Sequence, residues 1–94
     1  MQIIDSMILN KIMKFYVYIL KSEIDGNFYV GYTSDIESRM NAHNAGKVRS
    51  TKHRRPFVLV KTEIFNTRRE AMWREWQLKS KEIGSIEKSK LREN

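Results

Sequence analysis

The clearest pattern in the chain is an uninterrupted apolar run at residues 15–20, Phe-Tyr-Val-Tyr-Ile-Leu. Aromatic and β-branched residues favour strands, and the lack of polar alternation is typical of a strand that is covered on both faces. An Asp-Gly turn signal follows at residues 25–26, and residues 27–32 are again rich in aromatic and β-branched side chains. These two runs predict a β-hairpin. Residues 57–65, which Pro56 directly precedes, predict a third strand.

Two Ser/Thr-x-x-Glu spacings, at residues 34–37 and 67–70, are typical of capping boxes. They predict one helix over about residues 35–45 and another that begins after Thr67 and continues to about Lys81.

We expect Gly84 to end the second helix and Ser85 to cap a last short helix over residues 86–92. The element order β-β-α-β-α-α therefore predicts an α+β fold, in which helices flank a small three-stranded antiparallel sheet.

Residues 1–13 stand apart as an N-terminal extension, before a single domain at residues 14–94. Ile4, Ile8 and Ile12 have helical spacing, so the extension is either a short amphipathic helix or an unstructured leader. Met13 directly precedes the first expected strand and is a candidate for the natural start of translation.

The 94 residues leave room for one small domain. The formal net charge of +7 favours a polyanionic partner. The absence of cysteine rules out disulfides, cysteine-based metal sites and thiol nucleophiles. No apolar run approaches the length of about 20 residues that a membrane helix needs, and the first residues do not resemble a secretory signal, so we expect a cytoplasmic protein.

Basic side chains are densest at residues 47–55, a segment with no acidic residue that we expect to be a loop. Such a segment is either a solvated run of charge or a contact for a nucleic-acid backbone. Its basic residues are Lys47, Arg49, Lys52, Arg54 and Arg55.

Polar residues lie on the expected inner face of the first helix. Ile36 and Met40 mark that face, and helical spacing places Arg39 and His43 within or beside it. A buried charge is costly unless it is paired or holds a ligand. The plain alternatives are an arginine whose head reaches water and a structural histidine.

The second helix shows the same anomaly at Glu75, because Ala71, Met72, Trp76 and Leu78 indicate its inner face. The alternative interpretation of Glu75 is a surface ion pair with the lysine four residues later. Trp73 and Trp76 are expected in the core, with exposure as a docking face for a protein partner as the alternative.

Taken together, these residues resemble the GIY-YIG nuclease superfamily, and most closely its small single-domain bacterial members, which are similar to the N-terminal nuclease domain of the bacterial repair excinuclease. Tyr16-Val17-Tyr18 stands for the first triplet and Tyr29-Val30-Gly31 for the second. An arginine, a histidine and a glutamate follow at the family's spacing. Tyr16 replaces the family's first glycine, and an asparagine that some members carry after the glutamate helix has no clear match. The matching residues are Tyr18, Tyr29, Arg39, His43 and Glu75.

The resemblance implies an endonuclease that hydrolyses DNA phosphodiesters with one Mg²⁺ or Mn²⁺ ion, and it suggests branched, damaged or single-stranded substrates in repair or recombination. Arg39 would bind phosphate oxygens and Glu75 would hold the metal. Tyr18 would deprotonate the attacking water and Tyr29 would orient the phosphate, although these two roles could be exchanged. Tyrosine needs a lowered pKa for this task, and Arg39, the metal or His43 would supply the charge or relay the proton.

Two alternatives use the same fold. One is a nucleic-acid-binding module without catalysis, and the other is a subunit that needs a partner protein for targeting. Other chemistries fit the residues poorly, because no glycine-rich nucleotide loop, zinc spacing or nucleophile elbow occurs.

Overall fold

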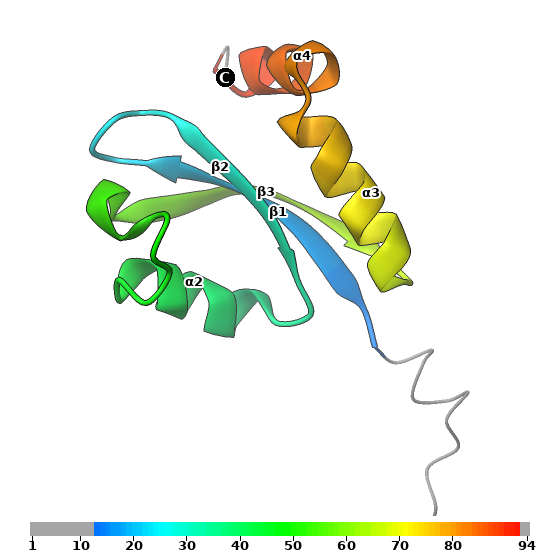
Figure 1. Cartoon of the computed structure of the whole chain (residues 1–94), viewed down its shortest axis with the longest axis horizontal. Coiled ribbons are helices and arrows are strands. Elements are labelled where there is room, and N and C mark those ends of the chain that lie inside the picture. Colours follow the sequence, from blue (N-terminus) through cyan, green and yellow to red (C-terminus); the bar gives the residue numbers. More distant parts are fainter. Residues whose placement is uncertain (1–12, 93–94) are drawn as a thin grey trace, which may run out of the picture.

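The computed structural model describes residues 13–92, and within this range three strands form one antiparallel sheet in the order β2-β1-β3. This confirms the α+β class and the expected order of elements (Figure 1). The helix or leader expected in the N-terminal extension lies outside the described residues. None of the helices between residues 13 and 92 is long and apolar enough to cross a membrane. The elements are β1 (Phe15–Ser22), β2 (Phe28–Thr33), α2 (Ile36–Asn44), the 3₁₀ turn η1 (Lys52–Arg54), β3 (Phe57–Phe65), α3 (Arg68–Lys79) and α4 (Lys81–Arg92).

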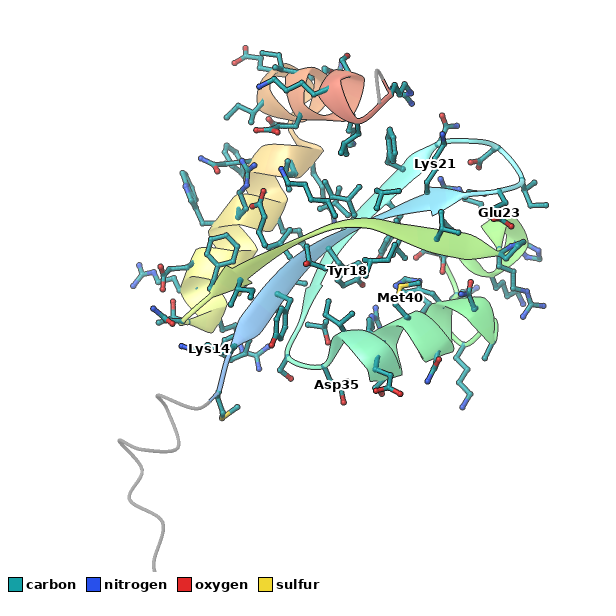
Figure 2. The ribbon with its side chains drawn as sticks, turned by 180° about the vertical axis from the view of Figure 1, so that it is seen from behind. Lys14, Tyr18, Lys21, Glu23, Asp35 and Met40 are labelled. Atoms are coloured by element: carbon teal, nitrogen blue, oxygen red, sulfur yellow. The ribbon has the colours of Figure 1, made fainter. Side chains whose placement is uncertain are left out.

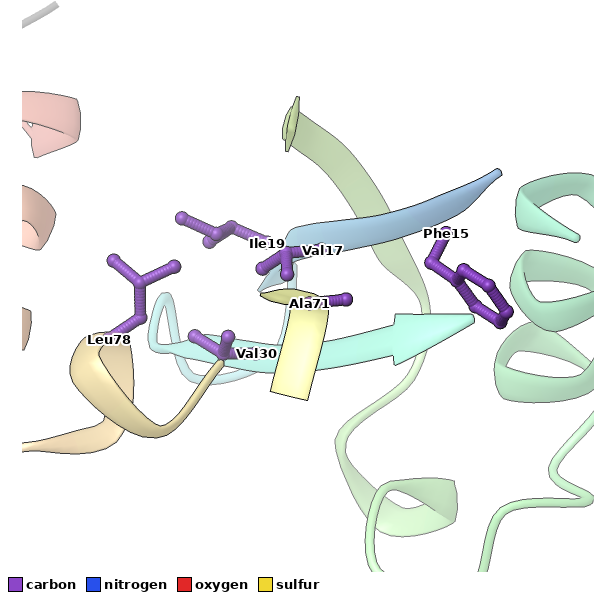
Figure 3. Close-up of a cluster of buried hydrophobic side chains, with 6 residues drawn as sticks. All are labelled: Phe15, Val17, Ile19, Val30, Ala71 and Leu78. Atoms are coloured by element: carbon purple, nitrogen blue, oxygen red, sulfur yellow. The ribbon is translucent and has the colours of Figure 1, made fainter. Parts of the chain in front are cut away.

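The central strand β1 is buried on both faces, as the unbroken apolar run predicted. Figure 1 shows α2 on one side of the sheet and α3 with α4 on the other. Val17 and Ile19 pack with Leu78 in an aliphatic cluster under α3 (Figure 3). Tyr18 and Leu20 alternate with them and belong to the cluster that α2 covers. One strand therefore supplies both cores, because its side chains point alternately to the two faces.

The predicted inner face of α3 is only half right. Ala71 and Leu78 are buried, but Met72 and Trp76 are exposed, and so is Trp73. The expectation that the two tryptophans belong to the core is therefore wrong. The helix buries a narrow stripe against β1 and β2 and leaves its largest side chains outside.

Hydrogen bonds at the helix starts confirm one expected cap and correct the other. Thr67 caps α3, and its hydroxyl accepts a hydrogen bond from the Glu70 amide at 3.1 Å. Ser34 does not cap α2. The Thr33 hydroxyl accepts a hydrogen bond from the Asp35 amide at 3.1 Å. The turn therefore extends one residue further, and the Asp35 carboxylate accepts the Ser38 amide at 3.0 Å.

The chain turns from α3 into α4 at Ser80, earlier than expected. The Ser80 hydroxyl donates to the Gln77 carbonyl at 2.7 Å and accepts from the Ile83 amide at 3.2 Å. Gly84 lies inside α4 and does not end a helix. A Cβ atom at this position would collide with the carbonyl oxygen of Leu78. Gly84 is therefore required by the close approach of the two helices.

Candidate active site

Tyr18 connects the sheet to the polar residues of α2. Its side chain lies between β1 and α2 (Figure 2) and is only 1% exposed. The hydroxyl oxygen lies 3.0 Å from Nε2 of His43 and accepts a hydrogen bond from Nε of Arg39 at 3.2 Å. The strand and the helix thus bring three of the predicted site residues into direct contact.

A second hydroxyl continues this chain of hydrogen bonds on the far side of His43. Nδ1 of the imidazole lies 2.9 Å from Oγ1 of Thr51, which also lies 3.3 Å from the carbonyl oxygen of Val48. If Thr51 donates to that carbonyl, it accepts from Nδ1–H, and Nε2 is then free to accept the proton of the Tyr18 hydroxyl. This tautomer gives every donor in the chain an acceptor.

Burial governs the ionisation of this pair. His43 is 0% exposed, and desolvation, helped by the positive charge of Arg39, lowers its pKa to about 4. Burial also raises the pKa of Tyr18, an effect that the hydrogen bond from Arg39 only partly opposes. His43 is therefore neutral near pH 7, so it offers Tyr18 a proton acceptor and not a positive charge.

Tyr29 lies beside the same pair and comes from β2. Its ring centroid is 5.0 Å from that of His43 and 6.4 Å from that of Tyr18. Nζ of Lys79 also lies over this ring, 5.9 Å from its centroid. Tyr29 thus contacts a residue of α2 and a residue of α3.

Glu75 reaches the site from α3, on the other side of the sheet. Its carboxylate lies 3.4 Å from Nζ of Lys79, the lysine that contacts Tyr29. Its charge is also one of the smaller causes that raise the pKa of Tyr18. The other four predicted residues contact one another, and Glu75 joins them through Lys79; this ion pair, the plain alternative for Glu75, is therefore present as well.

Sequence reasoning missed two residues of this site, Gly31 and Thr51. Gly31 is paired with Tyr18 across β1 and β2, and a Cβ atom there would collide with the Tyr18 hydroxyl. Its place at the end of the second triplet was the available signal. Thr51 had no comparable signal, because a lone threonine in a basic loop is ordinary.

A family model described as the GIY-YIG catalytic domain matches residues 14–84. The chain belongs to the GIY-YIG family. A UPF0213 protein of Staphylococcus haemolyticus is 50% identical over 68 residues, which is 71% of this chain and 82% of that protein. A UPF0213 protein of Streptococcus agalactiae is 43% identical over 67 residues, covering 70% and 75% of the two chains.

The solution NMR structure of a UPF0213 protein of Bacillus halodurans is similar in fold. It is 40% identical, with a TM-score of 0.51, over 82% of this chain and 84% of that chain. The GIY-YIG family is a family of nucleases that act on DNA, and its members generally depend on a divalent metal ion.

The basic loop of this GIY-YIG domain follows α2 and is held at the site through Thr51. Arg54 differs from the other basic residues, because its Nε lies 2.8 Å from the Asp25 carboxylate. The hydrogen bond from Arg54 lowers the pKa of the Asp25 carboxyl to about 2. It therefore joins the loop to the β1–β2 turn. The remaining four, Lys47, Arg49, Lys52 and Arg55, are exposed to solvent.

The donor set of the site fits a hard divalent cation that keeps most of its water. Between residues 13 and 92, no group of three or more His, Asp or Glu side chains could hold a metal. Glu75 brings a single carboxylate, and Mg²⁺ typically binds one or two carboxylates and retains several water molecules. A cation there would compete with Lys79 for Glu75.

Proposed function

We propose that this protein is an endonuclease that hydrolyses phosphodiester bonds in DNA with one Mg²⁺ or Mn²⁺ ion. The observation that carries the proposal is the hydrogen-bonded chain from Arg39 through Tyr18 to His43, with Glu75 at its edge. A buried tyrosine needs one acceptor for its hydroxyl, which His43 supplies, and here Arg39 also donates a hydrogen bond to the same oxygen. The combination suits a hydroxyl that exchanges a proton while a negative charge develops next to it.

In this proposal Tyr18 accepts a proton from the attacking water as its own proton passes to Nε2 of His43. His43 is neutral near pH 7, so Nε2 has a lone pair that can receive this proton, and it holds the proton only transiently because its pKa is about 4. Thr51 holds the imidazole in the tautomer that keeps Nε2 open.

Arg39 acts on the phosphate. Its Nε donates a hydrogen bond to the Tyr18 hydroxyl, and the remaining N–H groups of the guanidinium can donate to two phosphate oxygens. Tyr29 orients the phosphate from β2. Glu75 holds the metal ion, which when bound stabilises the charge on the phosphate and the leaving oxygen.

Phosphates beyond the site are bound by the exposed part of the basic loop, Lys47, Arg49, Lys52 and Arg55. Binding through backbone charge is sensitive to salt and nearly independent of sequence. Arg54 contributes less, because Asp25 already neutralises it.

The test is cleavage of flap, fork and plasmid DNA by purified protein with Mg²⁺ or Mn²⁺. We expect cleavage that Glu75→Gln and Arg39→Ala abolish and that Glu82→Gln, a matched change at an exposed carboxylate on α4, leaves intact. Salt-sensitive DNA binding without cleavage would support the alternative, a binding module that does not cut.

A further inference from the structure

The exposed face of α3 carries a pair of aromatic rings that the fold does not use. Trp73 and Trp76 are each 60% exposed. Their rings are stacked, with centroids 5.1 Å apart and an angle of 17° between the planes. Large aromatic side chains stabilise a protein mainly when they are buried, so an exposed stacked pair points to a ligand.

The pair lies in a groove that reaches the candidate active site. Met72, Trp73 and Trp76 form its apolar lining, and Arg69 and Glu75 also line it. Glu75 thus borders both the groove and the site around Tyr29. A DNA strand whose phosphate lies at Glu75 can continue along this face of α3.

We propose that Trp73 and Trp76 form a stacking platform for an unpaired nucleobase next to the cleaved phosphate. This proposal rests on the proposed nuclease function and defines its substrate class: DNA with at least one unpaired nucleotide at the cut, such as a single strand, flap or bulge. In an intact duplex, neighbouring bases cover both faces of each base. An unpaired base can extend the existing stack of two indoles.

Two arginines and two glutamates line the groove beside the apolar side chains, Arg68 and Arg69 with Glu70 and Glu75. The arginines can contact a backbone phosphate, and Glu75 is the residue proposed to hold the metal ion. A nucleotide brings both an aromatic face and a negative phosphate, and stacking on exposed aromatic residues beside basic side chains is the common mode of single-strand binding.

The chain contains only these two tryptophans, so its intrinsic tryptophan fluorescence reports on the platform alone. The experiment titrates the protein, without divalent metal, with a short single-stranded DNA and with an abasic strand of the same length and charge. We expect strong quenching and tight binding with the first strand, and weak quenching with binding about 5–150-fold weaker for the second.

Variants separate stacking from charge. Trp76→Ala should weaken binding of the base-containing strand several-fold and leave binding of the abasic strand unchanged, and Trp76→Tyr should restore most of the loss. Ile86→Ala, at an equally exposed apolar residue on α4, is the matched control and should change neither. Should an alanine variant fold poorly, the two strands still distinguish the outcomes on the unchanged protein.

Equal affinity and equal quenching with the two strands would overturn the platform. Self-association through the tryptophans would also overturn it. In that case, the fluorescence would be quenched when the protein alone is concentrated, and sedimentation would show a dimer that Trp73→Ser abolishes, because a second copy covers the tryptophans. The experiments test the nuclease and the platform separately. Cleavage without base-dependent binding would contradict only the platform, and base-dependent binding without cleavage would contradict only the catalytic activity.

Discussion

On one face β1 presents Val17 and Ile19 to an aliphatic cluster under α3, and on the other it presents Tyr18 to His43 on α2. The first face is mainly apolar, and at its edge Arg74 of α3 forms an ion pair with Glu63 of β3 at 2.6 Å. The second face buries polar groups, and within the described residues each buried side-chain nitrogen and oxygen has a hydrogen-bond partner. We therefore expect the α3 face to contribute most of the stability, and the α2 face to carry the proposed chemistry at some cost in desolvation.

The largest effect on the proposed chemistry of the α2 face is expected when the hydroxyl of Tyr18 is removed. If Tyr18 transfers the proton, Tyr18→Phe should lower the cleavage rate by about 10²–10⁴-fold while the protein remains folded. Tyr32→Phe is the matched control, because Tyr32 packs against the aliphatic cluster. Single-turnover cleavage with both variants tests this, and equal rates in the two would contradict the assignment of Tyr18.

The converse experiment truncates a residue on the aliphatic face. Ile19→Ala should lower the free energy of unfolding by about 2–5 kcal/mol, because it leaves a cavity in a core that is otherwise filled. Activity per folded molecule should not change. Urea denaturation measures the loss, with Ile64→Ala at an exposed position of β3 as the control that should stay within about 0.5 kcal/mol.

Acid should weaken the α2 face before the α3 face, because Arg74 lowers the pKa of the Glu63 carboxyl and their ion pair is lost only at still lower pH. The pKa of His43 is about 4 in the folded protein and about 6.5 in the unfolded chain, so between these values the unfolded state binds more protons. Stability should therefore fall by up to roughly 3 kcal/mol as the pH drops from about 6.5 to about 4. The carboxyl of Asp25 titrates below this window, because Arg54 holds its pKa at about 2.

Denaturation curves at several pH values measure this dependence. His43→Gln should flatten it, and His53→Gln, at the exposed second histidine, should not. A dependence that survives in His43→Gln would assign the acid sensitivity to another group.

Gly31 and Gly84 allow the two faces of the sheet to be compared by a single added methyl group. At each glycine, a neighbouring group lies so close that a Cβ atom would collide with it. Gly31→Ala crowds the Tyr18 hydroxyl, and Gly84→Ala crowds the Leu78 carbonyl. Each should cost about 1–3 kcal/mol of stability. Only Gly31→Ala should also lower cleavage per folded molecule, and NMR of the His43 ring should detect its displacement. Loss of cleavage in both would show that the two faces are not independent.

Much of the fold could be predicted from local patterns. The run at residues 15–20 indicated a strand buried on both faces, and Thr67 indicated the start of α3. The errors were also local. Ser34 and Asp35 are both good caps, and the bond from the Asp35 amide to Thr33 decided between them. Gly84 is a good helix terminator by type, but the approach of α3 to α4 decided its role.

The candidate residues could be predicted because they are polar residues at positions where the helical spacing predicts apolar ones. Arg39 and His43 lie on the apolar stripe of the first helix, and Glu75 lies beside that of the second. Their contacts could not be chosen in the same way. Thr51 is eight residues beyond His43, in a loop, and only the path of that loop brings its hydroxyl to Nδ1. The hydrophobicity of Trp73 and Trp76 predicts that they belong to the core, but it does not show whether another element covers this face of α3.

The sequence by itself determined the order of the strands and helices, the excess of positive charge and the residue types that define the family, because these follow from local preference and composition. The tertiary structure decided the protonation state of His43, the pairing of Arg54 with Asp25 and the exposure of the tryptophans. Desolvation, ion pairing and burial depend on which segments meet in space, and that information is absent from any short stretch of the chain.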